Sequence, residues 1–179
     1  MSESSSGQWP AALAVTRVGE DGWRAWREIR LAALADAPDS FADTLAETAA
    51  LPEREWRAMI RAGAIFIASA GPEPVGVAAG LPRESPAERG LGAMWAAPAW
   101  RGRRIAPMLA AAVIAWARSE GAARLGLWVP ADNARARAFY EGQGFRATGR
   151  SRAFPGSADR VISEMSLDLA EVPGRSRRR

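Results

Sequence analysis

A succession of strands and helices in residues 91–145 limits most strongly what this 179-residue chain can fold into. A short apolar strand is followed by an arginine-rich turn, an amphipathic helix, a second apolar strand and a short helix. The first helix has apolar residues at the 3.6-residue period, Pro107 in its first turn and Gly121 after its end. Its apolar positions are Ile105, Met108, Leu109, Ala112, Val113 and Trp116. Two strands joined by one helix are predicted to lie parallel, with their carboxyl ends facing a common ligand crevice.

The turn before this helix contains three arginines in four residues, Arg101, Arg103 and Arg104, around Gly102. The first backbone N–H groups of a helix have no partner within the helix, and they carry partial positive charge. An arginine turn that leads into such a helix is suited to binding phosphate groups. The sequence therefore predicts a phosphate site where this arginine turn meets the start of the helix.

The rest of the chain predicts one α/β (α+β) domain over residues 11–170, with a disordered N-terminal segment at residues 1–10 and a basic disordered tail at residues 171–179. Pro and Gly separate residues 64–69 from residues 74–81, which predicts a hairpin with Val75, Val77 and Ala79 on one face. The full predicted order is β-α-α-β-β-β-α-β-α-β-β. Its other elements are a strand at 11–18, a helix at 22–34, a helix from about residue 52, and strands at 146–151 and 161–169.

Three missing residue types restrict the chemistry. The chain has no Cys and no His, and all 24 of its basic residues are Arg. It therefore offers no thiol nucleophile, imidazole base, Schiff-base lysine or usual soft metal ligand. Catalysis would have to come from carboxylates, tyrosine, the backbone or a bound cofactor, and we expect no metal site.

Membrane and nucleic-acid functions are disfavoured. No run of eighteen apolar residues exists, and the polar, serine-rich start has no features of a secretory signal, so we expect a cytoplasmic protein. The net charge of +4 equals the contribution of the four arginines in the last five residues. The folded body is thus nearly neutral, and the terminal arginines lack the interleaved aromatic residues that favour nucleic-acid binding.

Two patterns resemble those of the GCN5-related N-acetyltransferase (GNAT) family. Residues 98–106 (PAWRGRRIA) are similar to the family's acetyl-CoA loop, in which Arg or Gln precedes x-x-Gly-x-Gly or Ala. Asn133, Ala136, Tyr140, Gly144 and Phe145 are similar to its second recurrent pattern, and the two occur in the family's order and spacing. The resemblance covers about residues 11–170. It implies a mixed, mostly antiparallel twisted sheet of about six or seven strands, with a parallel pair at the cofactor cleft and helices on both faces.

The resemblance also implies which residues bind acetyl-CoA, the acetyl donor. Backbone groups of Met94, Trp95 and Ala96 would contact the pantetheine arm and the thioester. Asn133 would lie near the pantetheine and Tyr140 beside the sulfur. The pyrophosphate would be held by Arg101, Gly102, Arg103, Arg104, Ile105, Ala106 and Pro107. Arg104 stands where the family has Gly, a change that is tolerated if its φ is negative and its Cβ points away from the phosphate.

Tyr140 is the only tyrosine in the chain, so we expect it to be the catalytic general acid that protonates the departing thiolate. The general base is left open. Some family members have a Glu five residues before the Asn, but Trp128 stands at that position here. Glu84, Glu88 and Glu164 are candidates, and a water chain or an already neutral amine would need no carboxylate.

The acceptor is also open between a small amine, an amino-acid derivative and a peptide or protein N-terminus. By family analogy it enters near residues 36–51 and 150–160, where Phe41 and Phe154 are the expected substrate-binding walls. The alternative to an enzyme is a non-catalytic acyl-CoA-binding regulatory module with the same fold. Homodimers are common in the family, so the resemblance implies a homodimer.

Overall fold

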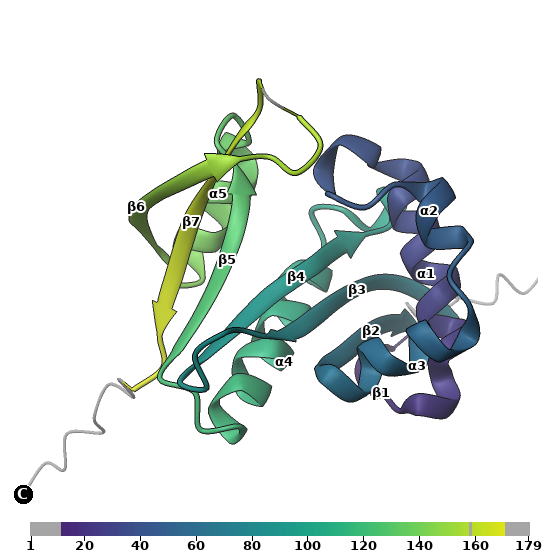
Figure 1. The fold of residues 1–179 in the computed structure, drawn as a ribbon. Coiled ribbons are helices and arrows are strands. Elements are labelled where there is room, and N and C mark those ends of the chain that lie inside the picture. The colour runs from purple at the N-terminus through teal and green to yellow at the C-terminus, as the bar shows by residue number, and fades with distance from the viewer. Residues whose placement is uncertain (1–11, 158, 171–179) are drawn as a thin grey trace, which may run out of the picture.

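The computed structural model describes residues 12–157 and 159–170, and these build one seven-stranded sheet in the order β1-β2-β3-β4-β5-β7-β6 (Figure 1). Neighbouring strands are antiparallel except β4 and β5, which run parallel as their helical connection predicts. The strands are β1 (Leu13–Val18), β2 (Ala64–Ala70), β3 (Glu73–Pro82), β4 (Glu88–Ala96), β5 (Arg124–Pro130), β6 (Arg146–Ala153) and β7 (Val161–Asp168). The mixed sheet with one parallel pair confirms the predicted fold class.

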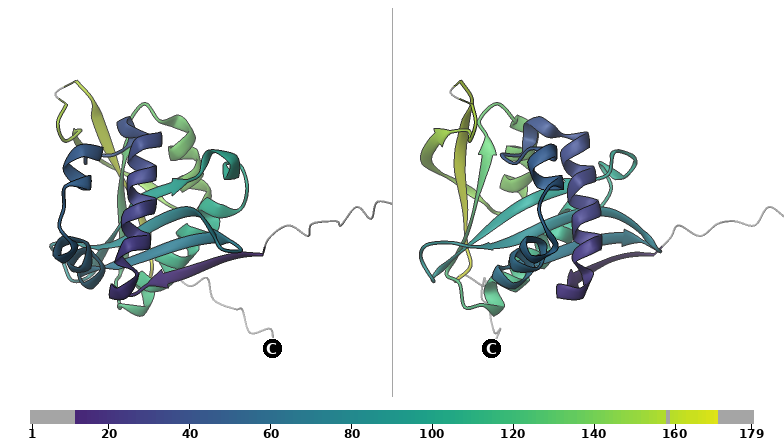
Figure 2. Two further views of the ribbon diagram at one scale, coloured as in Figure 1. Left: turned by 90° about the vertical axis from the view of Figure 1, so that its right-hand side faces the viewer. Right: turned by 45° about the vertical axis from the view of Figure 1, so that its right-hand side comes forward.

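Helices cover both faces of the sheet, as Figure 2 shows from two sides. One face carries α1 (Trp23–Asp36), α2 (Leu45–Ala49) and α3 (Glu53–Ala62), and the opposite face carries α4 (Ile105–Ser119) and α5 (Ala134–Gly142). Three short 3₁₀ turns connect these elements, η1 (Glu20–Gly22), η2 (Pro38–Ser40) and η3 (Pro98–Trp100). None of the helices in the described part of the chain has the length and apolar character needed to span a membrane.

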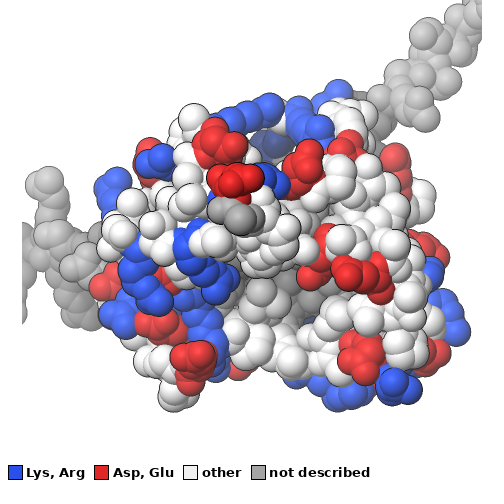
Figure 3. All heavy atoms as spheres, turned by 45° about the horizontal axis from the view of Figure 1, so that its top comes forward, with Lys and Arg blue, Asp and Glu red and all other residues white. Residues whose placement is uncertain are grey.

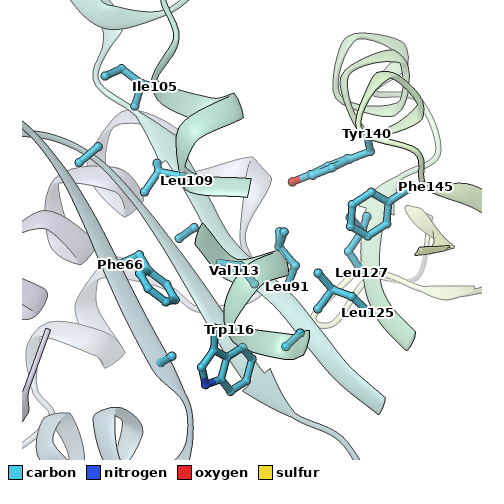
Figure 4. Packing of buried hydrophobic residues seen from close by; sticks show 14 of the residues in the cluster. Phe66, Leu91, Ile105, Leu109, Val113, Trp116, Leu125, Leu127, Tyr140 and Phe145 are labelled. Atoms are coloured by element: carbon cyan, nitrogen blue, oxygen red, sulfur yellow. The ribbon is translucent and has the colours of Figure 1, made fainter. Parts of the chain in front are cut away.

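The predicted apolar face of α4 packs into the buried cluster of the sheet (Figure 4). Glycines of β3 let the helix come close to that strand. A Cβ on Gly76 would lie 2.5 Å from Cγ2 of Ile105, and one on Gly80 would lie 2.3 Å from the Trp116 ring. Ile105 and Trp116 mark the two ends of the buried face of α4. Their contact with β3 therefore fixes where the helix begins and where the arginine turn lies.

One predicted face assignment is wrong. Val77 and Ala79 face α1 and α3, but Val75 belongs to the cluster on the α4 side. The pairing of β2 with β3 shifts between Ala68 and Ser69, which leaves Val75 as an extra residue in β3. Such a bulge reverses the alternation of side chains from that point on.

A second irregularity opens the sheet at β4. The parallel pairing with β5 is limited to Glu88–Gly90 opposite Arg124–Gly126. Farther along, the register between β3 and β4 shifts near Ala93, the only non-glycine residue with positive φ in the described chain, at 51°. The bulge turns β4 away from β5, so the two strands separate toward their carboxyl ends. A cleft lies in this opening, at the carboxyl ends where a ligand crevice is predicted. The N-terminal segment and the basic tail predicted to be disordered lie outside the described residues.

Candidate active site

A cleft of about 550 Å³ lies where β4 and β5 separate, between the η3 turn, the start of α4 and α5. Viewed from above, the surface is hollowed between the strands β5–β7 and the helices on the other side (Figure 3). The structure brings most of the predicted site residues into this cleft. They are Phe41, Met94, Trp95, Ala96, Arg101, Gly102, Arg103, Ala106, Pro107, Asn133 and Tyr140.

Three predicted site residues do not line the cleft. Ile105 is fully buried against β3, so only its backbone could face a ligand. The Arg104 side chain points to solvent outside the lining. Phe154 lies in the connection from β6 to β7 and is covered by the guanidinium of Arg160, 4.4 Å from its ring centre. Sequence reasoning missed other lining residues, among them Ala37, Ser40, Trp100 and Phe139.

The backbone of the arginine turn fits a bound diphosphate. Gly102 has a φ of 75°, whereas Arg104 has a φ of −66°. The position that requires glycine is thus Gly102, and Arg104 is free of backbone strain. The N–H groups of Gly102, Arg104 and Ala106 donate to no oxygen of the described residues, and no side chain caps α4. Unpaired donors at a helix start are the groups that bind phosphate oxygens.

Asp36 at the end of α1 holds two parts of this site together. Its Oδ2 accepts a hydrogen bond of 2.8 Å from the Trp95 indole and an ion-paired hydrogen bond from Arg101. Arg101 also donates to the carbonyl of Ala96, at 3.2 Å. The guanidinium of Arg101 is thus committed to the protein, which leaves Arg103 and Arg135 as the arginines of the cleft lining that have no carboxylate partner in the described chain. No local pattern predicted the role of Asp36.

Tyr140 reaches from α5 toward α4 with its hydroxyl oxygen leading (Figure 4). Asn133 caps this helix, because its Oδ1 accepts from the N–H of Ala136 at 3.0 Å. The tyrosine ring is only 8% exposed and packs edge to face on Phe139 and Phe145. Its hydroxyl has no hydrogen-bond partner among residues 12–157 and 159–170. Burial raises the pKa of Tyr140, so the hydroxyl keeps its proton and can donate it to a ligand in the cleft.

The three glutamates considered as bases line a separate cavity, not the cleft. Glu164 accepts hydrogen bonds from Arg83 at 2.7 Å and from Thr148 at 3.0 Å. Burial pushes the pKa of Glu164 upward, but the hydrogen bonds from Arg83 and Thr148 outweigh it and leave that pKa below its ordinary value. A carboxylate held in this way is a weak proton acceptor. Within the described residues, the cleft lining contains no Asp or Glu.

Comparisons with a family model and with solved structures point to the same kind of protein. The model of the acetyltransferase (GNAT) family matches residues 23–145. Among solved structures, yncA from Salmonella typhimurium, solved with its cofactor acetyl-CoA, is similar with a TM-score of 0.73 and 16% identity over 91% of this chain and 97% of that one. The ribosomal-protein-S18-alanine N-acetyltransferase from Escherichia coli has a TM-score of 0.67 and 18% identity over 92% and 98% of the two chains. At these identities the likeness establishes the fold. No curated protein matches by sequence.

Proposed function

The chain belongs to the acetyltransferase (GNAT) family, whose acetyl donor is acetyl-CoA, and from this premise we propose that it acetylates a primary amine of a small molecule or of a peptide or protein N-terminus. The observation that carries the proposal is the cleft between β4 and β5. It places a turn with unpaired N–H groups at one end and the unpartnered hydroxyl of Tyr140 in its wall.

Each part of the cleft has a distinct role in this proposal. Bound acetyl-CoA supplies the acetyl group as an activated thioester. The N–H groups of Gly102, Arg104 and Ala106 and the side chain of Arg103 would hold the pyrophosphate. Past Gly90 the edge of β4 that faces β5 has no strand partner, so its backbone N–H groups can polarise the thioester carbonyl. Tyr140 would give its proton to the sulfur. Because no carboxylate lines the cleft, the amine would lose its proton to water.

The alternative is a regulatory module that binds an acyl-CoA without turnover. Arg104 at the family's glycine position and the carboxylate-free cleft favour this reading. Measuring the release of free thiol from acetyl-CoA with a panel of amines distinguishes the enzyme from the regulatory module. Amine-dependent release supports the enzyme, and tight binding with no release supports the module.

Binding of the donor can be tested before any acceptor is known. We expect saturating acetyl-CoA, at about 100 times its Kd, to stabilise the protein by about 2.7 kcal/mol. For a domain of this size that is a rise in Tm of about 5–10 °C. Pantetheine, which lacks the diphosphate, should give a much smaller rise. If coenzyme A neither binds in a calorimetric titration nor raises the Tm, the proposal is wrong.

Asp36 should affect donor binding although it does not touch the donor in this proposal. Replacing Asp36 with alanine frees the Trp95 indole and the Arg101 guanidinium, so the end of β4 and the arginine turn lose a common anchor. We expect the KM for acetyl-CoA to rise about tenfold, which corresponds to about 1.4 kcal/mol. The kcat at saturation should change much less.

The matched control for this change is Asp39→Ala. Asp39 lies three residues farther on in η2, and its carboxylate makes no hydrogen bond or ion pair with a described residue. Steady-state kinetics with varied acetyl-CoA should therefore separate the two variants. Equal KM values for Asp36→Ala and Asp39→Ala would contradict the anchoring role.

A further inference from the structure

A second cavity, of about 560 Å³, lies on the face of β5 opposite to Tyr140. Leu125, Leu127 and Val129 of β5 belong to the same buried cluster as Tyr140. Side chains alternate along a strand, so Trp128 faces the other way, into this second cavity. Trp128 thus forms a wall that faces away from the expected donor side.

The strand register places this wall beside the opening of the sheet. Gly126 of β5 pairs with Gly90 of β4, and this is the last pair before the strands separate. Because the strands are parallel, Trp128 is level with Gly92 and next to the bulge at Ala93. An acceptor that approaches the end of β4 from this face would pass Trp128.

The carboxylates in this cavity are already neutralised, with one exception. Glu164 is held by Arg83 and Thr148, and Glu88 accepts from Arg124 at 2.5 and 3.0 Å. Glu84 is the remaining acidic residue in the lining. Little uncompensated negative charge is therefore left in this cavity. An acceptor that carries a further positive charge besides its reacting amine would find no partner for that charge here.

Two arginines of β6, in contrast, keep most of their donors free. The guanidinium of Arg152 lies 4.3 Å from the Trp128 ring centre and makes no ion pair with any carboxylate of the described chain. The side chain of Arg150 is 72% exposed and pairs with Glu164 at 3.4 Å, and its guanidinium lies 6.0 Å from the Trp128 ring centre. Figure 3 shows blue side chains gathered on the β5–β7 side of the central hollow. A guanidinium beside an indole still presents a planar fork of N–H groups, and this fork matches the two oxygens of a carboxylate.

We propose that the acceptor is a small amine that also carries a carboxylate, and that Arg152, with Arg150 beside it, binds this carboxylate while the amine reaches the end of β4. The inference rests on the proposed acetyltransferase function and narrows its substrate class. A polyamine or other polycation would meet like charges at this wall. A peptide N-terminus has no free carboxylate next to its amine, so it would leave both arginines without a partner.

Matched acceptor pairs test the proposal. The acids are 3-aminopropanoic, 4-aminobutanoic and 6-aminohexanoic acid, each compared with the alkylamine of the same carbon number. We expect kcat/KM to be at least about tenfold higher for the acid in the best-fitting pair, since a charge-assisted bidentate contact has about this value. Arg152→Gln should remove this preference and leave the alkylamine rates and the KM for acetyl-CoA unchanged. Arg146→Gln, also exposed on β6 but outside the cavity lining, is the control and should keep the preference.

The possible failures are distinguishable. Acetylation of alkylamines and amino acids with equal efficiency, or loss of activity toward both in Arg152→Gln, would overturn the carboxylate assignment and leave the acetyltransferase proposal standing. If no member of the panel turns over, calorimetry with the amino acids on the coenzyme A complex decides. Binding weakened about tenfold by Arg152→Gln supports the inference, and absent or unchanged binding overturns it. Failure of coenzyme A itself to bind would instead overturn the proposed function.

Discussion

Replacing Tyr140 with phenylalanine should lower the kcat for acetyl transfer by about 100- to 1,000-fold and change the KM for acetyl-CoA by less than about twofold. The substitution removes only the hydroxyl group, which is the proposed proton donor to the departing sulfur. The ring that remains keeps its edge-to-face contacts with Phe139 and Phe145. The loss should therefore appear in kcat, because proton donation matters in the transition state and not in donor binding.

The same substitution should leave the fold intact. The Tyr140 hydroxyl donates to no described residue, so its removal leaves no buried partner unsatisfied. The Tm should stay within about 2 °C of the wild type. Thr16→Val, which removes an exposed hydroxyl on β1, is the control and should leave both kcat and Tm unchanged. A Tyr140→Phe variant with wild-type turnover would show that the thiolate obtains its proton elsewhere.

The pH profile gives a second check on the same residue. Burial raises the pKa of Tyr140 above the ordinary tyrosine value of about 10. A proton donor with a raised pKa stays protonated as the pH rises, so kcat/KM should increase as the amine loses its proton and should show no descending limb up to about pH 10. A descending limb centred well below pH 10 would assign the acid role to a different group.

The fold was predictable where one local signal was strong. The apolar period of α4 and its boundary residues Pro107 and Gly121 predicted both the helix and the parallel strands that it connects. The bulge at Val75 was not predictable, because an apolar run gives no sign of which residue is left unpaired. The five-residue helix α2 was also missed. Its only local signal is the N-cap Thr44, whose hydroxyl oxygen accepts from the N–H of Glu47 at 3.2 Å and whose hydroxyl donates to the Glu47 carboxylate at 2.6 Å.

In the site, too, the residues next to strand ends were predictable, and the contacts between residues far apart in sequence were not. Residues 94–96, 101–107 and 133–140 come together because each segment adjoins a carboxyl end of β4 or β5. Asp36 lies 59 residues from Trp95 in sequence, and no spacing rule relates the two. Arg152 lies beside Trp128 because β7 pairs with both β5 and β6. Such contacts follow from the order of strands in the sheet, which a single sequence does not reveal.

Phe145→Ala should be the most destabilising of the substitutions considered. Phe145 is fully buried and packs its ring against Tyr140 with ring centres 5.7 Å apart. Removing a buried phenylalanine ring leaves a cavity and costs about 3–5 kcal/mol of unfolding free energy. For a domain of this size that corresponds to a fall in Tm of roughly 6–20 °C, measurable by calorimetry or circular dichroism.

The control is Leu45→Ala, because Leu45 is a large apolar residue that is 41% exposed and should cost less than about 0.5 kcal/mol. A comparable fall in Tm for both variants would contradict the assignment of Phe145 to the core. Phe145 also supports one side of the Tyr140 ring, so the folded variant should be slower as well as less stable. We expect the kcat of Phe145→Ala, measured well below its Tm, to fall about tenfold, since a small displacement of a catalytic group is costly. Unchanged kcat in the folded variant would mean that α5 and Phe139 alone hold the tyrosine in place.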